Sequence, residues 1–150
     1  MYEVVFDIST QTPPSWILGI AFASSAVGLI CVLMRYLRVG VSSLIAGALL
    51  ALVFGWQVYQ LAHLQGLLSQ GGVAVAQGAV RAFQPMPKSG HGSEQWCVEN
   101  ACFVYSQYET VPWFHRTESE GGPIHNGLFV RVHHVGNAIV RLEVRRDGKG

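Results

Sequence analysis

Two of the three cysteines in this chain stand at a spacing that could do chemistry. Cys97 and Cys102 flank the dipeptide Glu99-Asn100, which is typical of a two-residue hairpin turn because Asn tolerates a positive φ. Such a turn makes the cysteines a non-hydrogen-bonded pair with Cα atoms about 4.5 Å apart, which permits a disulfide. The alternative is a pair of thiols side by side on the inner face of a sheet. The C-x4-C spacing is not the C-x-x-C of redox catalysis.

The six histidines form no motif with a known mechanism. His133 and His134 are adjacent on a predicted strand, so their side chains point to opposite faces. His115 and His125 flank an acidic turn, the only place where His, Ser and carboxylate groups lie close in sequence. Metal-ligand spacing, G-x-S-x-G, H-E-x-x-H and the P-loop are all absent from the sequence. We therefore expect a non-enzymatic protein without metal or cofactor. The alternative is a redox or hydrolytic accessory enzyme that uses Cys97/Cys102 or the 115–125 loop.

Two uncharged runs dominate the first half of the chain, at residues 16–34 and 39–62. Of the 150 residues 50% are hydrophobic and only 13% are charged, whereas soluble domains carry about a quarter charged residues. Each run is long enough to cross a bilayer, which takes about 20 residues in a helix. The sequence therefore predicts a membrane protein with a transmembrane helical hairpin at 16–62.

The loop between the two runs sets the orientation, because it contains Arg35 and Arg38. By the positive-inside rule this loop is cytoplasmic, and both termini are extracytoplasmic. We expect a protein of the bacterial inner membrane whose C-terminal domain lies in the periplasm.

Small residues recur at every fourth position of the second run, a pattern that lets another helix backbone approach closely. They either pack the two helices of the hairpin together or form a dimerisation face. The residues are Ser43, Gly47, Ala51 and Gly55.

The second half of the chain predicts a small β domain. Residues 73–83 are typical of one long strand bent at Gly78, and hairpins are predicted at 95–105 and 128–145. A short helix is expected near 114–119. Five strands in this order favour an OB-like barrel, with an SH3-like barrel or an open sandwich as alternatives. The alternating residues 2–8 are compatible with an added strand.

The predicted organisation has five parts. They are an N-terminal segment at 1–15, the hairpin at 16–62, a helix extension and linker at 63–72, the OB-like domain at 73–145 with a loop at 88–93, and a mobile tail at 146–150.

Two stretches resemble NfeD-like proteins and together cover 31 of the 150 residues. Residues 120–142 are similar to the end of the family's C-terminal OB domain, where an EGGxIxxG turn leads into VxVxxVxGNxL, and residues 78–85 are similar to its first strand. The chain lacks the spacer that the family pattern has between Val135 and Gly136, and the family usually has more than two spans. The resemblance implies an OB fold and a stomatin-type membrane scaffold as partner. The pattern also resembles small uncharacterised bacterial membrane proteins with two spans.

Charge argues against nucleic acid as the partner of the β domain. OB barrels bind single strands through a positive groove, but residues 63–150 contain eight Lys and Arg against seven Asp and Glu. A membrane-anchored adaptor or scaffold that binds another membrane or envelope protein, or a second copy of itself, is therefore predicted. Two aromatics, Trp113 and Phe114, either plug the barrel or anchor a partner, and Glu118 and Glu120 lie in a polar segment suited to binding.

Overall fold

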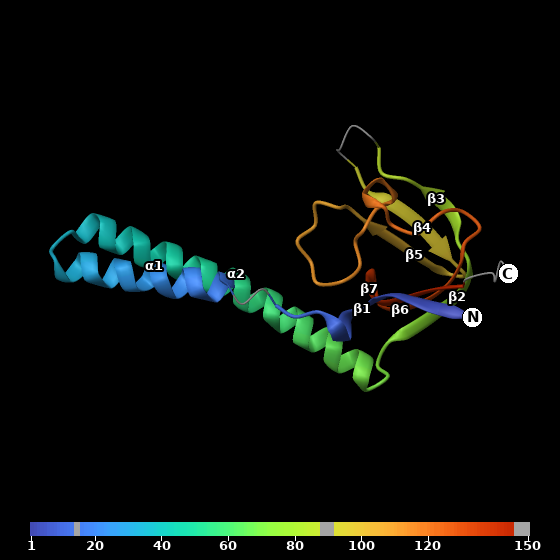
Figure 1. The fold of residues 1–150 in the computed structure, drawn as a ribbon, viewed down its shortest axis with the longest axis horizontal. Coiled ribbons are helices and arrows are strands. Elements are labelled where there is room, and N and C mark those ends of the chain that lie inside the picture. Colours follow the sequence, from blue (N-terminus) through green and yellow to red (C-terminus); the bar gives the residue numbers. More distant parts are fainter. Residues whose placement is uncertain (14–15, 88–91, 146–150) are drawn as a thin grey trace. The chain divides into compact units, whose positions relative to one another are not determined.

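The computed structural model describes residues 1–13, 16–87 and 92–145 (Figure 1). The chain divides into two compact units, one formed by Met1–Gln11 with Leu61–Gly150 and the other by Thr12–Gln60. The predicted mobile tail at 146–150 and residues 88–91 of the predicted loop lie outside the described residues.

The helical unit consists of α1, Trp16–Leu33, and most of α2, Leu37–Ser69. A three-residue turn joins them, and within it Arg35 has a φ of 69°. Among the described residues α2 is the one helix long and apolar enough to cross a membrane, and Gly19–Leu33 forms a shorter apolar helix. Both helices follow the uncharged runs of the sequence.

Small residues bring α1 and α2 into backbone contact. The Ser24 hydroxyl donates to the Ser43 carbonyl at 3.1 Å, and the Ser43 hydroxyl donates to the Ser24 carbonyl at 2.9 Å. A Cβ added to Gly47 would lie 2.6 Å from the Ser25 hydroxyl. Ser43 and Gly47 therefore pack the two helices together, whereas Ala51 and Gly55 from the same stripe are exposed.

A four-stranded antiparallel sheet contains both ends of the described chain. Its order is β1-β7-β6-β2, and the strands are β1 Tyr2–Asp7, β2 Ala74–Ala79, β6 Phe129–Val135 and β7 Ala138–Arg145. A short 3-10 turn, η1 Ile8–Thr10, follows β1. Because β1 pairs with β7, the chain leaves this sheet before the helices and returns to it after them. The N-terminal residues thus supply an added strand.

The second sheet has three strands in the order β3-β4-β5. They are β3 Arg81–Gln84, β4 Glu94–Val98 and β5 Ala101–Tyr105, and the 3-10 turn η2, Glu118–Glu120, lies further along the chain. The hairpin pairs Cys97 with Cys102 and Val98 with Ala101, which is the register predicted from the Glu99-Asn100 turn.

The predicted single strand at 73–83 is wrong, because β2 and β3 belong to different sheets. The chain changes sheets at Val80, two residues beyond the predicted bend at Gly78. The Val80 N–H donates to the Leu128 carbonyl at 2.8 Å, and the Val80 carbonyl accepts from Gly127 at 2.9 Å. These contacts to a distant loop fix the break. The helix expected near 114–119 is reduced to the single turn η2.

The predicted five-stranded closed barrel is also wrong. The described residues form seven strands in two antiparallel sheets that do not close into a barrel. One physical reason is that β1 pairs with the free edge of β7, so β7 cannot pair with a strand of the other sheet. Another is that the side chain of Asn137, in the β6–β7 turn, occupies backbone groups of β5. Its amide accepts from the Val104 N–H at 2.8 Å and donates to the Val104 carbonyl.

Apolar residues pack against both faces of the four-stranded sheet. The main cluster brings Trp96 and Phe103 of the small sheet together with Val132 and Leu142 of the large one, all fully buried. A second cluster covers the other face of β7 and joins Ile8, Leu61, Leu64 and Val140. The last turns of α2 are therefore part of the β domain's packing.

Candidate functional site

A pocket of about 520 Å³ opens in the β domain, where the end of α2 meets the four-stranded sheet. Strands β1, β6 and β7 line it with polar groups, whereas α2 and the residues up to β2 line it with uncharged ones. The lining residues are Asp7, Ser9, Gln65, Leu68, Ser69, Gly71, Val73, Val75, His133 and Arg141.

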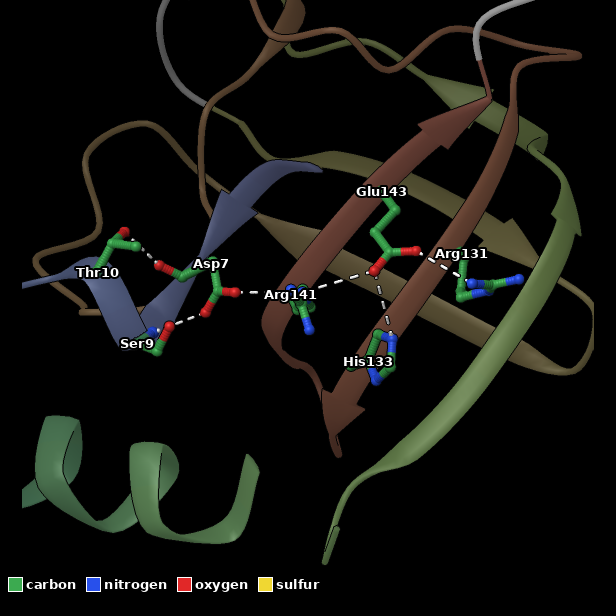
Figure 2. A network of polar contacts seen from close by, with 7 residues as sticks. All are labelled: Asp7, Ser9, Thr10, Arg131, His133, Arg141 and Glu143. Carbon is green, nitrogen blue, oxygen red and sulfur yellow. Dashed lines mark hydrogen bonds and ion pairs between the residues drawn. The ribbon is translucent and has the colours of Figure 1, made fainter. Parts of the chain in front are cut away.

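A chain of ion pairs on the four-stranded sheet includes three of the pocket-lining residues, Asp7, His133 and Arg141 (Figure 2). Arg141 Nε lies 3.2 Å from Asp7 Oδ2 and 3.5 Å from Glu143 Oε1. Arg131 Nη1 lies 3.3 Å from Glu143 Oε2, and His133 Nε2 lies 4.0 Å from Glu143 Oε1. Two arginines thus neutralise two carboxylates on one sheet face.

Strand register produces this cluster. Asp7 and His133 are both cross-strand partners of Arg141, and Arg131 is the partner of Glu143. Residues at i and i+2 on a strand share a face, so all five side chains project together. The sequence signal for this polar face is the alternation of polar residues at 131, 133, 141 and 143.

The network shifts the pKa of two of its members. Burial raises the pKa of Asp7, but the Ser9 hydrogen bonds and the charge of Arg141 outweigh burial and hold it below the usual range. For His133, burial and the nearby arginines outweigh Glu143 and lower the pKa below its usual 6.5. This lowered pKa favours the neutral form of His133.

The polar groups of this pocket are suited to binding a ligand. Arg141 Nε is buried within the network and makes no hydrogen bond of good geometry there. The Gln65 amide donates to the carbonyls of Ile8 and Gln11, which leaves its oxygen as an acceptor. Among the described residues, no group of three or more His, Cys, Asp and Glu is placed to hold a metal ion.

A second polar cluster lies inside the domain, around Glu94. This fully buried carboxylate accepts from the Tyr105 hydroxyl and from the Glu118 N–H, both at 2.8 Å. Trp96 Nε1 donates to the Tyr105 oxygen at 3.0 Å. Burial raises the pKa of Glu94, and burial together with the charge of Glu94 raises that of Tyr105. The cluster is closed and connects η2 to the core.

The cysteine pair forms a disulfide, with Cα atoms 4.0 Å apart. At the turn, Glu99 has a φ of 49°, and its carbonyl accepts from Arg81 Nη2 at 3.0 Å. Its carboxylate accepts from the Gln77 N–H at 3.3 Å. The disulfide lies on the small sheet and does not line the pocket.

The aromatic pair predicted as plug or anchor is largely inside the domain. Phe114 is buried and its ring packs edge-on against Phe6 and Tyr105, while Trp113 is half-buried in the second apolar cluster. Phe114 is thus part of the apolar core and not an exposed anchor. Glu118 and Glu120 are exposed on η2.

The two loop histidines contact nearby backbone. His115 Nδ1 lies 2.8 Å from the carbonyl of Trp113, and His125 Nδ1 lies 3.2 Å from the carbonyl of Asn126. No nucleophile is placed against either ring by these contacts.

No protein-family model, curated protein or solved structure matches this chain. The resemblance to NfeD-like proteins therefore stays a prediction from the sequence. The described residues form a two-sheet antiparallel domain, and a long apolar helix lies between its strands β1 and β2 in the sequence.

Proposed function

We propose that this protein is a membrane-anchored adaptor held by two spans, α1 and α2. The observation that supports two membrane spans is the pairing of β1 with β7. Strand β1 precedes the helices and β7 follows them, yet both belong to one sheet. A segment that leaves and re-enters the same folded domain crosses a membrane an even number of times. If α2 spans the bilayer, α1 must span it too.

The side chains of the helical unit support a lipid environment. Phe22 and Leu33 are each 74% exposed, and Leu52 is 69% exposed. Such large apolar surface is unfavourable in water and favourable in hydrocarbon. The approach of Ser24 to Ser43 through small residues is how helices associate in lipid, where the hydrophobic effect does not drive them.

Orientation follows from Arg35 and Arg38 in and beside the turn. The positive-inside rule assigns this turn to the cytoplasm of a bacterial cell and the β domain to the periplasm. A periplasmic domain agrees with the Cys97–Cys102 disulfide, because that compartment is oxidising.

The adaptor role rests on the exposed segment around η2. Glu118 and Glu120 project from a turn that the buried Glu94 holds in place through the Glu118 N–H. A rigidly held acidic turn suits recognition of another membrane or envelope protein, including a second copy of this chain. The NfeD-like resemblance makes a stomatin-type scaffold the first partner to test.

Thiol labelling of intact cells tests the topology. In a Cys31→Ala background, a membrane-impermeant maleimide should label Cys97 and Cys102 only after reduction. As a matched control, Tyr36→Cys in a chain without other cysteines should be labelled only once the membrane is broken. Labelling of Tyr36→Cys from outside, with Cys97 and Cys102 protected, would overturn the orientation.

Affinity purification in mild detergent tests the adaptor role. We expect a stoichiometric partner whose recovery falls when Glu118 and Glu120 are both changed to Gln. Recovery of the chain as a monomer without any partner would contradict the proposal.

A further inference from the structure

The exposed charge of the pocket is positive, although the network around it is neutral. The side chains of Asp7 and Glu143 are only 13% and 12% exposed, whereas that of Arg141 is 36% exposed. Both ion pairs of Arg141 involve its Nε, and over a third of the side chain is exposed, so the guanidinium is also accessible to a ligand. A guanidinium in this position binds phosphate or carboxylate oxygens through charge-assisted hydrogen bonds.

The opposite wall of the pocket is uncharged and partly apolar. Leu68 and Ser69 come from the last turn of α2, and Val73 and Val75 come from the residues leading into β2 and from β2 itself. Val75 is 53% exposed. A ligand with an anionic group and an adjoining apolar part fits both walls.

The place of these residues in the chain suggests the source of such a ligand. Gln65 follows the end of the uncharged run at Ala62 by three residues, about 5 Å at the α-helical rise. The polar layer on each side of the hydrocarbon core is of about the same thickness. Phosphodiester groups are abundant in that layer.

We propose that this pocket binds the phosphodiester group of a membrane phospholipid, with Arg141 as its anion ligand and the α2–β2 wall against the glycerol and acyl chains. The inference rests on the proposed membrane anchor. Lipid bound in this way would tie the β domain to the membrane surface beside its own anchor.

His133 should make this binding dependent on pH. The charged groups that face it are Asp7 of β1, Arg131 of β6, and Arg141 and Glu143 of β7, while α2 and β2 contribute only uncharged residues to the lining. Its pKa is lowered by burial and by the arginines. An added anion raises that pKa, so binding takes up a proton and strengthens as pH falls from 8 to 6.

The test uses the full chain in detergent and a short-chain phospholipid, dihexanoyl phosphatidylglycerol, followed by native mass spectrometry. We expect Arg141→Gln to weaken binding by about tenfold or more, because a charge-assisted contact is lost. The matched control Arg116→Gln removes the same charge from an exposed loop and should leave binding unchanged. Val75→Trp fills the pocket without altering any charge and should also block binding.

Two control ligands show whether the pocket recognises the phosphate group, the acyl chains or both. Dihexanoylglycerol contains the same tails without phosphate, and glycerol 3-phosphate contains the phosphate without tails. The proposal requires both to bind at least about tenfold more weakly than the phospholipid. Equal binding of dihexanoylglycerol, equal binding of glycerol 3-phosphate, or unchanged binding by both Arg141→Gln and Val75→Trp would each overturn it.

Membrane integration of the same variants is scored separately by alkaline extraction. Loss of lipid binding by Arg141→Gln with normal integration supports the pocket. A wild-type chain that is extracted from membranes contradicts the anchor, and with it the membrane as the source of the ligand, whatever the pocket binds.

Discussion

The helical unit and the β domain use the same apolar amino acids in opposite ways. In the β domain Trp96, Phe103 and Leu142 are fully buried between the sheets. In the helical unit Phe22 and Leu52 face outward, while serines and glycines form the contact between helices. The β domain hides apolar groups from water, and the helices present them to their surroundings. The difference agrees with the proposed membrane anchor, in which lipid surrounds the helices and water surrounds the β domain.

A lysine placed on each surface is the strongest test of this comparison. Leu52→Lys at the centre of α2 should cost about 3 kcal/mol for membrane insertion, because lysine is strongly disfavoured there. Val104→Lys on the exposed face of β5 should change stability by less than about 0.5 kcal/mol. The measurement is the fraction of the full chain that resists alkaline extraction. Equal, small effects would mean that both regions face water.

Inside the β domain the largest single effect should come from the buried carboxylate. Glu94→Ala removes the acceptor for the Tyr105 hydroxyl and the Glu118 N–H and leaves the Tyr105 hydroxyl buried without this partner. We expect unfolding to become about 2–3 kcal/mol easier, measured as the shift of the urea midpoint in detergent. Glu120→Ala on the exposed face of η2 is the matched control and should be close to neutral. A neutral Glu94→Ala would show that η2 is not tied to the core through this group.

Local features of the fold were predictable because short stretches of sequence determine them. The turns at Glu99-Asn100 and Gly136-Asn137 fix two hairpins and the register of Cys97 against Cys102. Helix α2 ends at Ser69, just before a glycine pair in which Gly71 has a φ of 73°.

Features that depend on distant contacts were not predictable in the same way. The change of sheet at Val80 is fixed by Gly127 and Leu128, and periodicity does not show such contacts. The pocket requires Asp7 beside Arg141, residues from opposite ends of the chain that only the β1–β7 pairing brings together. A closed barrel was therefore a reasonable but wrong extrapolation from local strand order.

Two glycines of α2 differ in their surroundings, because one lies at the contact with α1 and the other has open space around it. A Cβ on Gly40 would lie 2.5 Å from Val32 Cγ2 and 2.9 Å from the Gly28 carbonyl, whereas one on Gly55 meets nothing within 4 Å. Gly40→Ala should therefore destabilise the helix pair by about 1–2 kcal/mol through overpacking. Gly55→Ala should be neutral or slightly stabilising. Thermal unfolding in detergent would measure both, and equal effects would argue against close α1–α2 contact.

The pH dependence of stability separates the buried cluster of the β domain from its pocket. Burial raises the pKa of Glu94 above 4.5. The contribution of this shift to the stability of the folded state is therefore fully present below pH 4.5, and it is lost as the pH rises through the pKa of Glu94 in the folded protein. The pKa of His133 is lowered below 6.5. The contribution of this shift to the stability of the folded state is therefore present above pH 6.5, and it is lost as the pH falls through the pKa of His133 in the folded protein. Asp7, with a pKa below 3.8, acts only at lower pH.

Between pH 4.5 and 6.5 these two contributions oppose each other, so the wild-type chain should show the smallest net change of the series. Glu94→Ala removes the increase in stability that protonation of Glu94 provides as the pH falls. This variant should therefore lose stability more steeply than the wild-type chain on acidification. His133→Gln removes the decrease in stability that protonation of His133 causes, so this variant should become more stable as the pH falls. Urea midpoints at three pH values across this window measure the slopes. Identical slopes in all three proteins would mean that neither group changes its pKa on folding, and the contrast between a closed buried cluster and an open pocket would then lose its electrostatic basis.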